Sequence, residues 1–176
     1  MLSEIVVKRI NSEHVFKPFD CGNQDLNDFL LNDSKMYLEN LLAVTYVFET
    51  DEDTVAYFSV SNDKISVTDT RKSVWRKIRS LFSHSLHRRD YPSVKLGRFA
   101  VNAKFQNSSV GTHIVDFIKN MFITNNRTGC AFITVDALQS AVPFYLKNDF
   151  IFLEDVSNTL DNHTIQMYFN LKNYRM

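Results

Sequence analysis

The sequence contains few of the residues that break regular structure or cross-link a chain. Its 176 residues include only four glycines and three prolines, which excludes a linker-rich or disordered chain. The two cysteines, Cys21 and Cys130, have neither the density of a disulfide framework nor the spacing of metal ligands. We therefore expect reduced, buried thiols and predict no metal site.

An excess of charge of one sign is missing as well. Lys and Arg together number 20, as do Asp and Glu, so the formal net charge is zero. Overall charge therefore predicts neither a polyanionic nor a membrane partner. No apolar run is long enough to span a bilayer, and the first ten residues lack the apolar core of a signal peptide. We expect a cytoplasmic protein.

The bulk composition is that of a globular domain. Hydrophobic residues make up 44% of the chain and charged residues 23%, which is ordinary for such a domain. A chain of 176 residues is long enough to bury one good core. We expect a single domain over residues 1–176, with a core rich in phenylalanine, which occurs 15 times.

Hydrophobic periodicity predicts strands interleaved with helices. Expected strands cover residues 4–10, 43–48, 54–60, 94–101, 131–135, 151–153 and 164–171. Expected helices cover residues 25–31, 34–42, 70–87, 111–125 and 140–148. This order favours an α/β (α+β) fold with one mixed, mostly antiparallel sheet and helices on both faces.

Single residues define parts of these expected helices. Asn23 is expected to cap the helix at 25–31. Ser140 is expected to cap the last helix, which places Pro143 in its first turn, where proline costs no hydrogen bond. In the helix at 111–125, an apolar stripe faces the core and Lys119 is expected on the opposite, polar face.

Residues 94–111, VKLGRFAVNAKFQNSSVG, are the most informative segment. An apolar run leads into a turn of small polar residues, and an amphipathic helix begins directly behind it. The first turn of a helix carries unpaired N–H groups and a partial positive charge, and small side chains let an anion approach the backbone. The pattern predicts a pyrophosphate site and favours an acyl-carrying nucleotide cofactor, although an ordinary polar turn that caps a helix has the same composition.

Several segments resemble one known family in the right order. Residues 106–112, QNSSVGT, resemble the cofactor motif Gln/Arg-x-x-Gly-x-Gly/Ala of the GCN5-related N-acetyltransferases (GNAT). Residues 96–101, LGRFAV, and 133–137, ITVDA, are similar to that family's fourth and fifth strands. Residues 141–150, AVPFYLKNDF, resemble its A-x-x-F-Y-x-x-x-G-F helix. The resemblance covers nearly the whole chain and implies acetyl-CoA as the cofactor.

The N-terminal segment resembles one branch of this family. Residues 19–30, FDCGNQDLNDFL, are similar to the F-x-C-G-x-x-x-L-x-x-F/W-L opening of a GNAT branch. That branch includes toxins that acetylate aminoacyl-tRNA.

Two positions depart from the family pattern. Ser109 stands where the first glycine of the cofactor motif is expected, and Asp149 replaces the glycine before Phe150. Asp tolerates the left-handed conformation better than most residues, so we expect a mild effect at Asp149. At Ser109, the side chain would either crowd the pyrophosphate or donate a hydrogen bond to it.

The resemblance implies that backbone groups hold the cofactor. N–H groups of residues 106–112 would cradle the pyrophosphate, and residues 99–101 would offer backbone groups to the pantetheine arm. A plain core strand at 99–101 is compatible with that role. The candidate cofactor-binding residues are Phe99, Ala100, Val101, Gln106, Asn107, Ser108, Ser109, Val110, Gly111 and Thr112.

Tyr145 is the candidate catalytic residue that the resemblance implies. Its phenol would protonate, or hydrogen-bond to, the departing thiolate of coenzyme A. The alternative is a half-buried aromatic side chain on an amphipathic helix. Asp136, at the end of a strand, either orients the substrate or caps the next turn.

The sequence gives only indirect information on the acceptor of the acetyl group. No carboxylate lies on residues 94–101, where many relatives keep a base; Lys95 and Arg98 are there instead. A lysine amine has a pKa of about 10.4, whereas that of an α-amino group is about 7.7–8.0. An acceptor with an easily deprotonated amine, such as an aminoacyl group, is therefore favoured unless another loop supplies a base.

Residues 71–89 combine many cations with no acid. They could form a phosphate-contacting face for RNA, or the solvated face of a helix that packs on the sheet. The cationic side chains are Arg71, Lys72, Arg76, Lys77, Arg79, Arg88 and Arg89.

Three functional hypotheses follow from these residues. The first is an N-acetyltransferase that moves an acetyl group from acetyl-CoA to a primary amine, on a small molecule or an aminoacyl group, in a ternary complex. The second is a toxin-like enzyme that acts on aminoacyl-tRNA. The third is a non-catalytic GNAT-fold binding protein, which the serine at position 109 suggests. The sequence leaves homodimer formation open.

Overall fold

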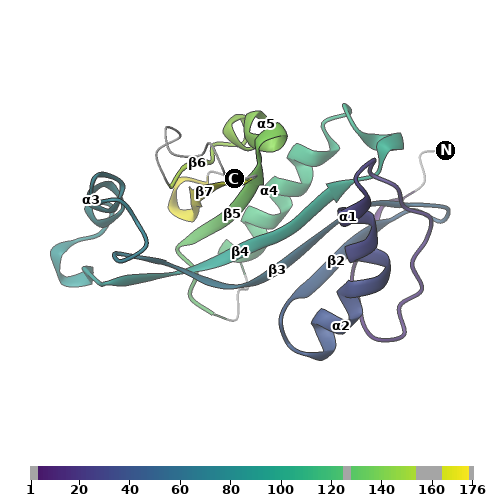
Figure 1. The fold of residues 1–176 in the computed structure, drawn as a ribbon, viewed down its shortest axis with the longest axis horizontal. Coiled ribbons are helices and arrows are strands. Elements are labelled where there is room, and N and C mark those ends of the chain that lie inside the picture. Colours follow the sequence, from purple (N-terminus) through teal and green to yellow (C-terminus); the bar gives the residue numbers. More distant parts are fainter. Residues whose placement is uncertain (1–3, 125–127, 154–163, 175–176) are drawn as a thin grey trace. The chain divides into compact units, whose positions relative to one another are not determined.

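The computed structural model describes residues 4–124, 128–153 and 164–174. Strands and helices alternate along the chain (Figure 1). The strands are β1 (Val6–Arg9), β2 (Val44–Glu49), β3 (Thr54–Ser66), β4 (Asp90–Val101), β5 (Phe132–Leu138), β6 (Ile151–Phe152) and β7 (Thr164–Asn170). The α-helices are α1 (Gln24–Asp28), α2 (Ser34–Glu39), α3 (Lys72–Ser80), α4 (Val110–Ile123) and α5 (Val142–Lys147).

The strands form one seven-stranded sheet in the order β1-β2-β3-β4-β5-β7-β6. β4 and β5 pair in parallel, whereas β1–β2, β2–β3, β5–β7 and β6–β7 are antiparallel. The expected mixed, mostly antiparallel sheet is confirmed. The register of β4 with β5 covers Ser93–Lys95 and Phe132–Thr134, although β4 continues to Val101.

The chain divides into two compact units. The first comprises Met1–Ser61 and Leu96–Asp116, and the second Asn62–Lys95 and Phe117–Met176. In the first unit, the π-helical turn Phe29–Asp33 follows α1 (Figure 1) and buries Phe29 and Leu30, against which Leu26 of α1 is partly buried. Its core cluster consists of Ile10, Phe19, Phe29, Leu30, Val47, Tyr57 and Ala100.

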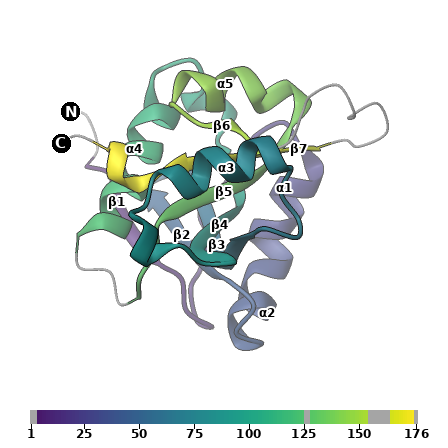
Figure 2. The ribbon, with the colours of Figure 1, turned by 90° about the vertical axis from the view of Figure 1, so that its left-hand side faces the viewer.

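The core of the second unit is also aromatic. Helix α3, which lies toward the viewer in Figure 2, contributes Trp75 and Ile78 of its apolar side to a buried cluster that also contains Phe132 of β5 and Tyr168 of β7. Its remaining face is exposed, because the apolar residues of the helix recur at helical spacing and the cations lie between them. None of the helices in the described ranges is long and apolar enough to cross a membrane.

Two local expectations are corrected and one is confirmed. Ser140 does not cap the last helix: it lies in a 3-10 turn at Gln139–Ala141, and α5 begins after Ala141, with Pro143 in its first turn as expected. Strand β3 extends six residues beyond the expected end at Val60. The cap at Asn23 is confirmed, because its side chain accepts a hydrogen bond from the N–H of Leu26 at 3.2 Å.

Candidate active site

The loop at residues 106–112 has the backbone conformation of an anion-binding turn. Asn107 and Ser109 are left-handed, with φ of 61° and 64°, and α4 begins at Val110. At the start of the helix, the N–H of His113 donates to the carbonyl of Ser109 at 3.1 Å. No described residue accepts a hydrogen bond from the N–H groups of residues 107–112. Alternating left- and right-handed residues ahead of a helix present such N–H groups to an anion.

Ser109 keeps the conformation that the glycine of the motif would supply. A left-handed residue costs roughly 1–2 kcal/mol when it carries a Cβ, so the backbone here holds its shape against the preference of the side chain. The serine is also exposed. Ser109 therefore combines a backbone conformation that favours glycine with an exposed side chain.

The side chain of Gln106 holds this loop to Cys21 of the N-terminal motif and to Val101 at the end of β4. Its Nε2 group donates to the carbonyl of Cys21 at 3.0 Å and to the carbonyl of Val101 at 2.9 Å. Both amide protons are used in these bonds, so the side chain shapes the loop at the end of β4. Ser108 contributes too, because its hydroxyl donates to the carbonyl of Phe105.

The N-terminal motif lies against the same loop. Besides the bond from Gln106, the carbonyl of Asp20 accepts from the N–H of Ala103 at 2.8 Å. The Asp20 carboxylate accepts from the N–H of Gly22 and from the amide of Asn27, and these bonds lower the pKa of Asp20. Two sequence motifs that are far apart in the chain thus build one structural element.

Both cysteines are free and half-buried. The thiol of Cys21 lies 3.1 Å from the side-chain oxygen of Asn27, and burial raises its pKa. Burial raises the pKa of Cys130 as well. Neither thiol is activated as a nucleophile, because a reactive cysteine needs a lowered pKa.

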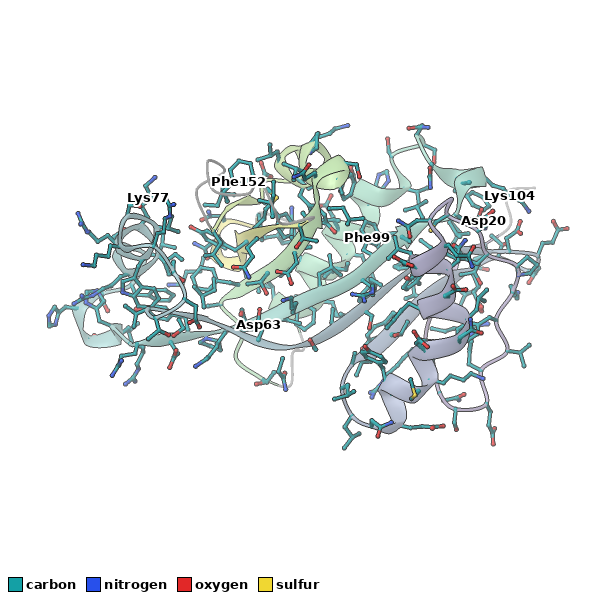
Figure 3. The ribbon with its side chains drawn as sticks, viewed as in Figure 1. Asp20, Asp63, Lys77, Phe99, Lys104 and Phe152 are labelled. Atoms are coloured by element: carbon teal, nitrogen blue, oxygen red, sulfur yellow. The ribbon has the colours of Figure 1, made fainter. Side chains whose placement is uncertain are left out.

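Residues 99–101 form the C-terminal end of β4, as expected (Figure 3 labels Phe99). Ala100 is buried in the core of the first unit, while Phe99 and Val101 are half-buried. The strand therefore serves as core on one face and remains accessible in part on the other.

Tyr145 is fixed by the C-terminal cap of α5, within the second unit. The N–H of Phe150 donates to the carbonyl of Tyr145 at 3.0 Å, and the N–H of Asp149 donates to the carbonyl of Leu146 at 3.1 Å. Asp149 is left-handed, with φ of 65°, and the rings of Tyr145 and Phe150 lie 5.3 Å apart. These are the two bonds and the apolar contact of a Schellman motif.

The ring of Tyr145 is buried, and its hydroxyl has no hydrogen bond to any residue within 4–124, 128–153 and 164–174. The residue is 6% exposed, and burial alone raises its pKa well above the usual value. Among the described residues, the fully enclosed unpartnered side-chain atoms are Ser93 Oγ and Asn120 Oδ1, so the Tyr145 oxygen retains some accessible surface. A protonated phenol with an unused donor is suited to give a proton to a ligand.

The expectation that Lys119 lies on the polar face of its helix is wrong, because its side chain lies in the interior. It is 3% exposed, its Nζ donates to the carbonyl of Asn148 at 2.9 Å, and it lies 4.2 Å from the ring centre of Phe169. A cation at the C-terminus of a helix is favourable because the last carbonyls carry partial negative charge. Lys119 therefore joins α4 to the end of the helix that carries Tyr145.

The second unit contains a polar cluster that the sequence interpretation missed in part. Lys95 pairs with Asp136 at 2.5 Å, and the turn Gln139–Ala141 that follows β5 has no side-chain cap hydrogen bond, so the expected capping role of Asp136 is not seen there. Asp63 accepts a hydrogen bond from Thr134 across the sheet (Figure 3 labels Asp63). Asp63 escaped notice because residues 61–64, SNDK, look like a polar loop, whereas they continue β3.

The cationic side chains of residues 71–89 are all exposed. Arg79 donates to the ring of His87 at 3.0 Å, and Lys77 points outward from α3 (Figure 3). The structure is compatible with both readings of the segment, since the apolar side of α3 packs on the core and the cations face solvent.

Comparison with known proteins identifies the family. A model described as "Acetyltransferase (GNAT) domain" matches residues 79–168. The chain belongs to the GNAT acetyltransferase family. The match includes the loop at 106–112, Tyr145 and the cap at Asp149, so the expected membership is confirmed.

Solved structures share the fold over nearly the whole chain. A tyrosine-to-phenylalanine mutant of KacT has 21% identity and a TM-score of 0.77, covering 96% of this chain and 95% of that one. AtaT complexed with acetyl-methionyl-tRNAfMet has 20% identity and a TM-score of 0.76, with 96% of each chain covered. AtaTR bound with acetyl-CoA has 20% identity and a TM-score of 0.73, covering 98% of this chain and 96% of that one.

Proposed function

We propose that the chain is an acetyl-CoA-dependent N-acetyltransferase that acts on a primary amine. The observation that carries the proposal is the left-handed turn of residues 106–112, whose N–H groups are unused by the described residues at the start of α4. A diphosphate carries the charge and the oxygen acceptors that such a turn binds. The candidate residues at 99–101 and 106–112 are retained as the cofactor site.

Acetyl-CoA, when bound, supplies the acetyl group as a thioester. Backbone N–H groups of residues 99–101 would polarise its carbonyl. As the amine nitrogen displaces the sulfur from the carbonyl carbon, the amine would lose one proton to solvent. Tyr145 would give its phenolic proton to the leaving sulfur and regain one from solvent. Fixing the amine and the thioester together supplies much of the rate enhancement.

Substitution of Tyr145 tests this assignment. We expect Tyr145→Phe to lower kcat by about 10²–10⁴, the usual contribution of a general acid, and to leave the Kd for acetyl-CoA unchanged. Calorimetry with acetyl-CoA measures binding. Release of the free thiol, with simple primary amines and bulk aminoacyl-tRNA as acceptors, measures turnover.

Tyr168→Phe is the matched control. Tyr168 is also buried, and burial also raises its pKa, so loss of a buried hydroxyl as such would affect both variants. An undiminished kcat in Tyr145→Phe would remove the tyrosine from the mechanism. Absence of acetyl-CoA binding at millimolar concentration would favour the non-catalytic alternative.

A toxin-like enzyme that acts on aminoacyl-tRNA is the second candidate. It is favoured by the exposed cations of residues 71–89 and by the fold shared with AtaT, whose solved structures include a complex with acetyl-methionyl-tRNAfMet and a tyrosine-to-phenylalanine mutant bound to the C-terminus of the antitoxin AtaR. Growth arrest on expression, relieved by Tyr145→Phe, would support it. Harmless expression of an active enzyme would contradict it.

A further inference from the structure

A pocket of about 240 Å³ lies within the second unit and has no role in the steps above. Lys95 and Thr134, the last paired residues of β4 and β5, both line it. Pockets for drug-sized ligands measure roughly 300–1,000 Å³, so this one fits a group about the size of a single amino acid. Beyond Lys95, β4 continues in sequence to Val101.

The charges of the pocket leave unpaired carboxylates. Lys95 neutralises Asp136 at 2.5 Å, and Lys64 pairs at 3.2 Å with Asp90, which does not line the pocket. Asp63 and Asp69 have no ion pair with any described residue. Such a pocket attracts a cation, because low-dielectric walls concentrate the field of the carboxylates.

Asp63 is the better placed of these two carboxylates. The Thr134 hydroxyl donates to its Oδ2, which fixes the orientation of the carboxylate. Its Oδ1 has no hydrogen bond to any described residue. Asp63 is half-buried, whereas Asp69 is exposed. A hydrogen bond to a charged group is worth more when both partners are partly removed from water.

The rest of the lining is mixed. Ser66, Thr70 and Gln166 are polar, and four buried apolar side chains form another part of the wall, which suits an aliphatic group beside the cation. They are Ile65, Val135, Leu153 and Met167.

We propose that this pocket binds the acceptor as its primary ammonium ion, held at Asp63, with an aliphatic side chain against the four apolar residues. The ammonium ion loses its proton to solvent before the neutral amine reacts. The inference deepens the proposed acetyl transfer and rests on it. It makes Asp63 a substrate-binding residue and Lys95 the residue that limits the negative charge of the pocket.

Leucinamide is the probe, and 4-methylpentanamide, which lacks the amino group, is the matched ligand. Titration followed by ¹H–¹⁵N NMR is expected to shift the backbone amides of Thr134 and Val135 with leucinamide and to shift them much less with 4-methylpentanamide. Asp63→Asn keeps the shape of the side chain and its bond from Thr134, and it is expected to weaken leucinamide binding about tenfold or more. Asp51→Asn, at an exposed position between β2 and β3, is the control and should leave binding unchanged.

Lys95→Met tests whether removing a cation from the pocket strengthens the binding of leucinamide. This substitution leaves Asp136 unpaired, so the cationic probe is expected to bind more tightly, whereas damage to the pocket would weaken binding. Equal affinity for the two ligands, shifts confined to other parts of the chain, or weaker binding by Lys95→Met would overturn the proposal.

Calorimetry with acetyl-CoA on the same samples separates this proposal from the proposed function. If acetyl-CoA binds and leucinamide does not, the pocket assignment alone is wrong. If leucinamide binds at Asp63 and acetyl-CoA does not bind, acetyl transfer is wrong and the amine site stands as a site without that reaction.

Discussion

Ser109 and Asp149 show how a side chain occupies a position that favours glycine. Both are left-handed, with φ of 64° and 65°. Asp149 belongs to a cap whose two hydrogen bonds and ring contact hold it in place. Ser109 precedes α4 and is held by the loop that Gln106 fastens. At each position the neighbouring residues fix a left-handed backbone, although the Cβ of the side chain makes that conformation less favourable than it is for glycine.

Replacement of Ser109 by glycine should stabilise the protein. We expect Ser109→Gly to raise the free energy of unfolding by about 1 kcal/mol, because glycine adopts positive φ without a Cβ penalty. Ser109→Val should lower it. Urea unfolding measures both, and acetyl-CoA calorimetry on Ser109→Gly tells the two readings of the hydroxyl apart: tighter binding indicates crowding, and weaker binding indicates a lost hydrogen bond.

The kcat/KM of the reaction should not fall at moderately alkaline pH. Because burial raises the pKa of Tyr145, the phenol stays protonated through the range in which an ordinary tyrosine begins to ionise, near pH 10. We expect kcat/KM to rise as the acceptor amine deprotonates and then to stay level up to about pH 10. A fall that begins below pH 9 and is absent in Tyr145→Phe would contradict this assignment of the proton donor.

At the scale of elements, the helix that carries Tyr145 is too short to be stable alone. It has six residues, whereas isolated helices shorter than about 12–15 residues are marginal in water. Its stability comes from the cap at Asp149 and from Lys119, which reaches from α4 to the carbonyl of Asn148. The helix of the proposed cofactor site thereby fixes the end of the proposed catalytic helix.

Lys119→Met tests this link. The substitution keeps the length of the side chain but leaves the carbonyl of Asn148 without its donor, so we expect a loss of about 1–3 kcal/mol in the free energy of unfolding. We also expect a lower kcat with an unchanged Kd for acetyl-CoA, and partial recovery in Lys119→Arg. Lys147→Met, on the exposed side of α5, is the control. A fall in kcat as large in that control would contradict the role of Lys119.

At the scale of the whole molecule, cationic and acidic residues are equal in number but unevenly distributed along the chain. The chain has 20 cationic and 20 acidic residues, yet residues 71–89 contain exposed cations and no acid. A local surface of this kind binds polyanions even when the net charge is zero, because screening confines the field to about 8–10 Å at physiological salt. RNA contact at α3 is therefore compatible with a neutral protein.

Substitutions on α3 test that contact. We expect Lys77→Gln to weaken tRNA binding and to reduce the slope of log K against log salt by about one. Lys147→Gln, also exposed but outside residues 71–89, should change neither. Filter binding at several salt concentrations measures both quantities. Equal effects of the two substitutions would show that the contact is not located on α3.

The sequence by itself determined the elements and the features that depend on neighbouring residues. The cap at Asn23, the turn at residues 106–112 and the left-handed Asp149 each follow from a few adjacent residues, so local chemistry was sufficient. The order of strands and helices likewise determined the mixed sheet. The end of β3 was placed too early because its exposed polar residues, including Asp63, look like a loop.

Only the tertiary structure decided which distant residues meet. Gln106 bonds to Cys21, Lys119 to Asn148 and Thr134 to Asp63, across 85, 29 and 71 positions of the chain. Periodicity reports which face a residue occupies on its own element, and it contains no information on the partner that folding brings to that face. A buried lysine and a pocket carboxylate are therefore indistinguishable from surface residues until the chain is folded, because burial and pairing are properties of the packed structure.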